Sequence, residues 1–320
     1  MNGIVAYSAY LPYFRLERKA IGESLGPSAG SGTRSVASYD EDSTSMAVEA
    51  ARAAMRAAPD VRPGALYFAT STPAYLDKTN ASAIHAALAL DAQAPAFDML
   101  GSVRSGAGAL WAAIDAGRPT LAALADIRTG LPGGGDEREG GDGAVAFLLG
   151  DSRTALAEPL ARASASAEFL ERWRLPGDAV SRQWEERFGE HAYVPLGEAA
   201  VTDALKQAGL TAAAVARWIV TGPHARASRR VASSVGAAKG TVADDLAGSI
   251  GNTGTAHAGL MLADALDRAQ PDELIAVVSL ADGCDVTIYS GRRRRSPHGG
   301  RRRRSPRSSR RAAVSPTRRF

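Results

Sequence analysis

Short apolar segments alternate with helical patterns along most of this chain, and the alternation falls into two blocks. Buried strands next to amphipathic helices are typical of α/β folds, and two similar blocks indicate a duplicated core with connections of the usual right hand. The strands that we predict are residues 3–12, 65–70, 121–126, 143–149, 216–222, 273–283 and 284–289. The predicted helices are residues 42–55, 80–90, 198–210, 225–235 and 255–267, and the spacing of Leu110, Trp111 and Ile114 predicts a further one. Residues 26–42, rich in Gly, Ser and Asp, are predicted to form a loop.

The domain organisation follows from these blocks. We predict an N-terminal half at residues 1–150, an irregular or helical insertion at 151–195 and a C-terminal half at 196–291. The tail, 292–320, has 13 arginines and no acidic residue. Because the whole chain has a net charge of +4, residues 1–291 carry a net charge of +4 − 13 = −9. Without core-forming residues the tail is expected to be disordered. Its abrupt start after Tyr289 is typical of a reading-frame shift in a GC-rich gene, and we favour such an artefact or a truncation over nucleic-acid binding.

Composition narrows the function classes. No apolar segment is long enough to span a membrane, and the N-terminus lacks the pattern of a signal peptide, so a cytoplasmic protein is expected. A single cysteine, Cys284, excludes an internal disulfide, and the five histidines have no metal-ligand spacing. We therefore predict no metal site.

Residues 97–115, FDMLGSVRSGAGALWAAID, predict a strand, a tight turn of small residues and a buried helix. Such an elbow presents one side chain at a helix N-terminus, where free N–H groups and the helix dipole favour negative charge. Many acyl-transfer enzymes hold their nucleophile there. The residues at this tip are Val103, Arg104 and Ser105.

Three further segments complete a pattern: GDGAVAFLLG (141–150), VTGPHARASRR (220–230) and GSIGNTGTAHAGLMLADAL (248–266). With the elbow, they resemble the thiolase-fold condensing enzymes, in particular the 3-hydroxy-3-methylglutaryl-CoA synthase and ketoacyl synthase III branch of archaeal or actinobacterial type. The resemblance covers roughly residues 1–290. It implies a duplicated five-layer α/β/α/β/α fold, a homodimer formed through the strand beside the elbow, and an acyl thioester of CoA or acyl carrier protein as substrate, with no separate cofactor.

The family holds an acyl group on a cysteine at the elbow and stabilises an enolate with a histidine and an asparagine. His224 and Asn252 match those two positions, so the resemblance implies that both are catalytic. From the residues alone, His224 could equally be a surface-loop histidine, and Asn252 could serve its Gly-rich turn. An imidazole N–H and a side-chain amide are both suitable donors to an oxyanion.

Two catalytic positions depart from the family. Its cysteine position falls on Val103, and its general-base glutamate, located by aligning Tyr75 and Lys78, falls on Ser71. We expect Val103, Arg104, Ser105 and Ser71 to line the substrate site. Cys284 is expected to be a buried structural thiol.

Without an acylated cysteine, standard ping-pong condensation is not expected. We predict instead decarboxylation of a malonyl-type thioester, or aldol or retro-aldol chemistry on a β-hydroxyacyl thioester, both through an enolate. The alternative is a non-catalytic subunit that scaffolds a thiolase or an OB-fold partner. Nucleic-acid binding by the tail is the weakest interpretation.

Overall fold

The computed structural model describes residues 1–25 and 30–291, so the predicted disorder of the tail falls outside the described residues. The main sheet has nine strands in the order β11-β12-β13-β8-β1-β7-β6-β4-β5. Its two halves meet where β1 (Asn2–Tyr10) pairs with β8 (Ala157–Ser166), through Ile4 and Ala157. Each side of this junction corresponds to one block of the sequence.

The first half runs from β1 to β7. Its elements are β1, α2 (Ser43–Ala57), β4 (Leu66–Thr70), α3 (Asn80–Ala87), β5 (Ala96–Leu100), α4 (Ser105–Asp115), β6 (Thr120–Asp126) and β7 (Gly143–Asp151). β4 is parallel to both β5 and β6, whereas β7 is antiparallel to β6 and β1. This half contains each helix and strand that the sequence predicts for it.

The second half repeats the order. It comprises β8, α6 (Glu186–Ala208), β11 (Arg217–Thr221), α7 (Ala225–Ser234), α8 (His257–Arg268), β12 (Leu274–Leu280) and β13 (Gly283–Gly291). Where the first half has β5, the second has an isolated parallel bridge between Trp218 and Val242. α6 ends at Gly209 with φ +65°, a left-handed conformation that glycine adopts at helix ends.

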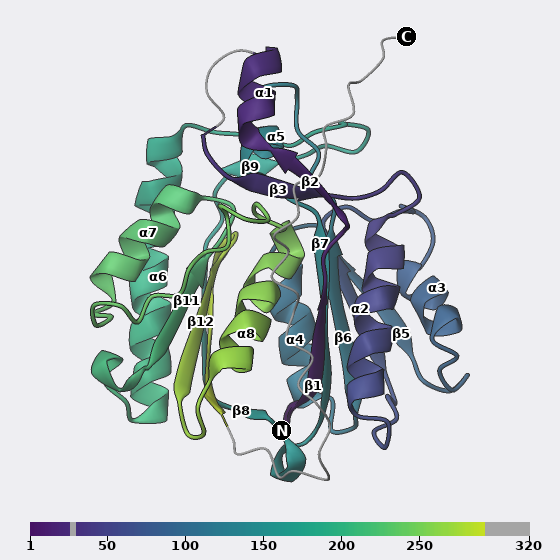
Figure 1. The fold of residues 1–320 in the computed structure, drawn as a ribbon. Helices are drawn as coiled ribbons and strands as arrows, with labels where there is room; N and C mark the ends of the chain where they lie inside the picture. Colours follow the sequence, from purple (N-terminus) through teal and green to yellow (C-terminus); the bar gives the residue numbers. More distant parts are fainter. Residues whose placement is uncertain (26–29, 292–320) are drawn as a thin grey trace.

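Three apolar cores lie between five layers. The first, around Met46 and Phe68, packs α2 and α3 on the outer face of the first half-sheet, and the third, around Tyr193 and Trp218, packs α6 and α7 on the second. The middle core contains α4 and α8, which Figure 1 shows side by side between the two half-sheets. Gly259 permits α8 to pack closely on β7, because a Cβ there would lie 2.6 Å from Val145 Cγ1. The predicted duplicated five-layer α/β/α/β/α order is present.

Part of the predicted loop 26–42 forms a strand, while its residues 26–29 lie outside the described residues. β3 (Thr33–Val36) pairs with β2 (Phe14–Glu17), which continues into α1 (Arg18–Leu25). The β3 backbone also bonds across the molecule, since Ser35 N donates to Ile250 O at 2.9 Å. Distant partners order this segment, and its own sequence does not indicate them.

The second half begins earlier than predicted. Residues 151–195, interpreted as an insertion, supply all of β8 and the first turns of α6. The buried face of β8 has only Ala and Pro, and its one large apolar side chain, Leu160, is exposed, which hides its alternation. Residues 167–185, with the two-stranded β9 (Arg172–Trp173) and β10 (Arg182–Gln183), lie between these repeated elements. The short helix α5 (Gly135–Glu139) lies between β6 and β7. In the described residues, no helix is both long enough and apolar enough to cross a membrane.

Candidate functional site

The predicted elbow joins β5 to α4. Gly101 turns the chain with φ +115°, which favours glycine, and the turn closes with Ser105 N donating to Ser102 O at 3.1 Å. Val103 stands at the tip, beside a cavity between the two halves. The Ser105 hydroxyl donates to Leu100 O at 3.0 Å. No ionisable side chain of the described residues hydrogen-bonds to that hydroxyl, so Ser105 has no base that would make it a nucleophile.

Arg104 fastens the elbow to the second half. Its guanidinium donates to both Asp285 carboxylate oxygens, at 2.8 and 3.1 Å, and to Asp282 O at 2.7 Å. It also donates to the hydroxyls of Ser164 and Ser166. The bond to Asp285 raises the Arg104 pKa above its usual value. With its donors engaged inside the protein, Arg104 acts as a clamp between the halves.

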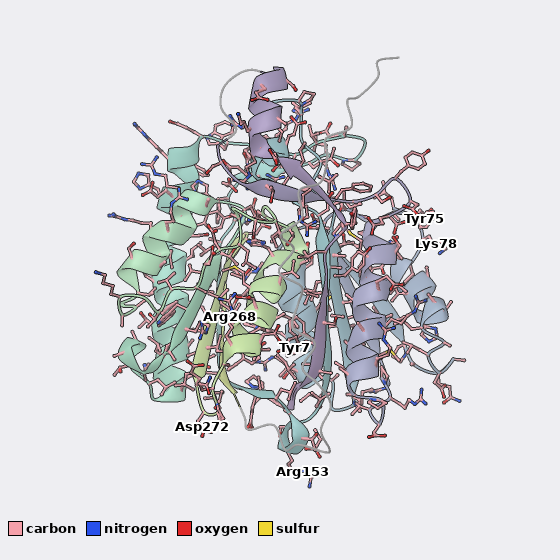
Figure 2. The ribbon with its side chains drawn as sticks, viewed as in Figure 1. Tyr7, Tyr75, Lys78, Arg153, Arg268 and Asp272 are labelled. Carbon is pink, nitrogen blue, oxygen red and sulfur yellow. The ribbon has the colours of Figure 1, made fainter. Side chains whose placement is uncertain are left out.

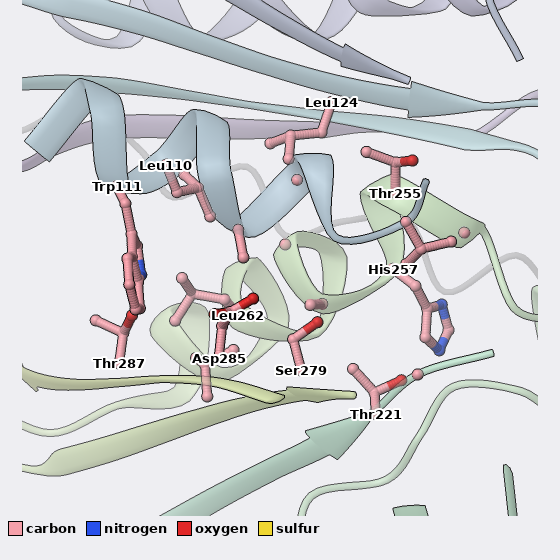
Figure 3. Close-up of a pocket in the computed structure, with 18 of the residues that line it drawn as sticks. Leu110, Trp111, Leu124, Thr221, Thr255, His257, Leu262, Ser279, Asp285 and Thr287 are labelled. Atoms are coloured by element: carbon pink, nitrogen blue, oxygen red, sulfur yellow. The ribbon is translucent and has the colours of Figure 1, made fainter. Parts of the chain in front are cut away.

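The cavity beside Val103 lies between α4, α8 and strands β11 to β13 (Figure 3). Its wall is apolar along α4 and α8 and carries hydroxyls and one carboxylate on the strand side. The space that the centre of a water molecule can reach is about 30 Å³, room for about two waters. The lining residues are Val103, Gly106, Ala107, Leu110, Trp111, Leu124, Thr221, Gly222, Asn252, Gly254, Thr255, His257, Ala258, Gly259, Leu262, Val277, Ser279, Asp285, Thr287 and Tyr289.

Asn252 lines this cavity with a fixed amide. Its Oδ1 accepts from Gly254 N at 2.9 Å, and its Nδ2 donates to Gly222 O at 2.9 Å. The Gly254 N–H requires an oxygen acceptor, so these contacts determine which amide atom is which. One of the two Nδ2 hydrogens serves Gly222, and the second is a donor held beside the cavity. Both interpretations of Asn252, as a turn residue and as an oxyanion donor, are compatible with this geometry.

His224 lies outside the cavity lining. It is 6% exposed and caps α7, with Nδ1 accepting from Ala227 N at 3.0 Å. This contact places the proton of the neutral ring on Nε2. The ring faces α6: a Cβ at Gly189 would lie 2.7 Å from His224 Nε2, and the Tyr193 ring centroid is 6.2 Å away. His224 is therefore a buried residue rather than a surface-loop histidine.

Ser71 also lies outside the lining. Its hydroxyl and its N–H both donate to Asp126, at 2.8 and 2.7 Å, and its carbonyl accepts from Arg174 Nη2 at 2.6 Å. The same loop carries Tyr75 and Lys78 near the molecular surface (Figure 2), where the Lys78 ammonium lies 5.0 Å from the Tyr75 ring centroid. Of the six predicted site residues, the cavity contains Val103 and Asn252, and a neighbouring open groove is lined by Arg104 and Ser105.

Sequence reasoning missed Asp126, which connects the loop after β4 to the turn before α8. This buried carboxylate accepts from Thr70 Oγ1 at 2.8 Å, from both Ser71 donors, and from Thr255 N at 2.7 Å. It is 0% exposed. A Cβ at Gly254 would lie 2.2 Å from Asp126 Oδ2, so glycine is required there. The Ala-rich surroundings of Asp126 gave no sequence signal of this role.

Two further missed residues have unusual environments. Thr255 lines the cavity, and its hydroxyl, within the described part of the chain, is buried without a hydrogen-bond partner. Glu171 is 4% exposed, and burial raises its pKa, although the charges of His224 and Arg172 oppose that shift. The side chains of Glu171 and His224 converge on Gly189, where a Cβ would lie 2.9 Å from Glu171 Cγ. Glu171 belongs to the segment that was interpreted as an insertion.

Two other ionisable side chains, His257 and Cys284, have environments that favour a structural role. His257 bonds within the protein through both nitrogens: Nδ1 accepts from Thr253 N at 3.2 Å and Nε2 donates to Asp245 O at 2.9 Å. Burial lowers its pKa to about 4. Burial raises the pKa of Cys284, 0% exposed on β13, to about 12, which disfavours the reactive thiolate. Within residues 1–25 and 30–291, no group of three or more His, Cys, Asp and Glu side chains is arranged to hold a metal ion.

Comparison with known proteins bears on the fold and the family. No family model matches the sequence. The chain is 31% identical over 302 residues to the hydroxymethylglutaryl-CoA synthase of Caldivirga maquilingensis, covering 88% of this chain and 84% of that protein. It is 29% identical over 303 residues to the Methanopyrus kandleri protein of the same name, covering 90% of this chain and 86% of that protein.

Solved structures give the same picture of the fold. The 3-oxoacyl-[acyl-carrier-protein] synthase III of Aquifex aeolicus superposes with a TM-score of 0.77 at 21% identity, covering 91% of this chain and all of that one. The Pseudomonas aeruginosa synthase III superposes with a TM-score of 0.79 at 22% identity, covering 91% of this chain and 98% of that one. These likenesses confirm the predicted thiolase-like fold.

Proposed function

Because this chain belongs to the hydroxymethylglutaryl-CoA synthase family, we propose that it acts on an acyl thioester of coenzyme A or acyl carrier protein without forming a covalent acyl-enzyme. One observation carries the proposal. Val103 stands at the elbow tip and lines the same cavity as Asn252. A valine side chain has no nucleophile, whereas an amide N–H beside the cavity can still stabilise an oxyanion.

The chemistry that remains is enolate chemistry. The second Nδ2 hydrogen of Asn252 would donate to the thioester oxygen as it becomes negative. His224, the other residue that the resemblance implies to be catalytic, follows two positions after Gly222, the acceptor of Asn252 Nδ2, and its own ring faces Gly189. The reaction would need no cofactor.

Two reactions use such a site. In decarboxylation of a malonyl-type thioester, the bond to the carboxylate breaks, its electron pair forms the enolate, CO₂ leaves, and a proton then adds to carbon. In retro-aldol cleavage of a β-hydroxyacyl thioester, water takes the hydroxyl proton, the adjacent C–C bond breaks, and a carbonyl product and an enolate form. The enolate carbon then takes a proton from water. Aldol addition is the reverse. None of these steps acylates the protein.

A non-catalytic role is the second candidate. β5 is the edge of the main sheet, and it exposes Phe97 (55%) and Leu100 (39%) beside the elbow. An unpaired edge with apolar side chains is suited to pairing with another chain. A homodimer would use this edge, and a scaffold for a thiolase or an OB-fold partner would keep the thioester site without turnover.

The test combines thermal shift and mass spectrometry on the full chain with acetyl-, malonyl-, acetoacetyl- and β-hydroxyacyl-CoA. We expect a shortened acyl product, lost in Asn252→Ala and reduced in His224→Ala. The exposed His191→Ala is the matched control and should keep full turnover. A thermal shift without product would support the scaffold. An acyl adduct on the protein would contradict the proposed mechanism.

A further inference from the structure

The cavity beside Val103 extends along α4 and ends at an indole. Ala107 and Trp111 follow on successive turns of that helix and line the same wall. Figure 3 shows Trp111 above Thr287 at the end of the cavity away from Thr221. A group that enters at the elbow therefore meets the Trp111 ring as the end wall.

Trp111 is held in this position from two sides. Its Nε1 donates to Thr287 Oγ1 at 2.9 Å, which attaches it to β13. The Arg162 guanidinium lies 5.3 Å from the ring centroid, a cation–π distance, and Arg162 is itself bound to both oxygens of Asp115 at 2.9 and 2.8 Å. These contacts oppose rotation of the indole out of the end wall.

A second, more open space also reaches the indole. It is the groove at the elbow that is lined by Arg104 and Ser105. Both spaces share Ala107, Trp111 and Asp285 as lining residues. Asp285 is fixed by the Arg104 clamp and Ala107 is small, so Trp111 is the bulky, replaceable part of the shared wall.

We propose that Trp111 determines which acyl thioesters this protein accepts, restricting the acyl group to about two or three carbons. This inference rests on the proposed thioester function and deepens it. Room for about two water molecules accommodates an acetyl or propionyl group. A longer chain would displace the indole and break its bond to Thr287. Removal of the indole would join the cavity to the groove and let longer chains extend into it.

The test measures binding of acetyl-, butyryl-, hexanoyl- and octanoyl-CoA to the full chain by calorimetry. For the native protein we expect octanoyl-CoA to bind at least about tenfold more weakly than acetyl-CoA, because one surplus methylene already costs about tenfold in a closed pocket. Trp111→Ala should reverse this order. Trp111→Phe keeps an aromatic wall and should keep the preference for acetyl-CoA.

Thr287→Val is the second variant, since it removes the acceptor of the indole N–H with little change in shape. We expect a partial relaxation toward butyryl- and hexanoyl-CoA while the melting temperature stays near that of the native protein. Equal binding of all four chain lengths to the native protein would overturn the role of Trp111 and leave the thioester function standing. Failure of every CoA thioester to bind native protein and variants alike would overturn the proposed function itself.

Discussion

At the scale of single residues, His257 gives the chain a predictable acid sensitivity. Burial lowers its pKa to about 4 in the fold, against about 6.5 when unfolded. The unfolded chain therefore binds more protons between these values, and stability is lost as the pH falls from about 6.5 to about 4. The unfolding free energy of the native protein should therefore differ between pH 7 and pH 4.5, and we expect His257→Gln to remove up to about 3 kcal/mol of that difference, as measured by urea unfolding at both pH values.

The control for this measurement is His191→Gln, because His191 is exposed on α6. That variant should follow the native curve at both pH values. If His257→Gln lost stability between pH 7 and 4.5 as steeply as the native protein, another group would be responsible for the acid sensitivity.

Asp126 is the second residue-scale prediction. Every donor that reaches it is a hydroxyl or a backbone N–H, and the carboxylate is fully buried. Asp126→Asn would turn an NH₂ group toward those donors, so we expect a loss of about 2–4 kcal/mol in unfolding free energy. The exposed Asp203→Asn should change it by less than about 0.5 kcal/mol. Equal unfolding midpoints for the two variants would refute this role for Asp126.

At the scale of elements, α2 has a complete capping box. Asp42 Oδ1 accepts from Ser45 N at 2.6 Å, and Ser45 Oγ accepts from Asp42 N at 2.8 Å. Asp42→Ala should cost about 1 kcal/mol, measured by thermal or chemical unfolding, because one buried helix end loses its acceptor. Asp42→Asn retains a side-chain oxygen and is the matched control, with an expected change in unfolding free energy of only a few tenths of a kcal/mol. A similar loss in both variants would mean that charge, rather than capping, stabilises this end.

The elements that the sequence predicted share a local signal. α2 has its cap residue and apolar face, α6 its terminal Gly209, and β6 and β7 their apolar runs. β8 and β3 were missed for physical reasons. The buried face of β8 carries only Ala and Pro, and its one large apolar side chain, Leu160, lies on the exposed face, so the strand has little hydropathy contrast. β3 depends on partners far away in sequence, including Ile250. Local patterns cannot encode such long-range pairing.

At the scale of the whole molecule, Arg104 links the halves. Asp285 is 7% exposed, so Arg104→Met would leave its charge buried with a hydroxyl from Ser164 as a remaining partner. We expect the free energy of unfolding to fall by about 3–5 kcal/mol, because an unpaired buried charge is destabilising. The double variant Arg104→Met/Asp285→Leu should recover part of that loss, as measured by a double-mutant cycle in urea. Additive effects of the two single variants would rule out the clamp.

The candidate site was predictable only in part. The elbow and the Gly-rich turn of Asn252 have sequence motifs, and the cavity that contains both Val103 and Asn252 follows from the fold that those motifs imply. The rotation of His224 toward Gly189, the buried carboxylate of Glu171 and the end wall at Trp111 depend on side-chain packing between segments distant in sequence. Such packing leaves no motif.

The duplicated core has a consequence for how this protein came to differ from its relatives. Val103 and Asn252 occupy corresponding places, each just ahead of the central helix of its own half. Two separate stretches of the gene therefore encode the two sides of one cavity. A mutation in the first stretch changes the side chain at the elbow and leaves the amide of the second as it is. Each side of the cavity can therefore evolve separately from the other.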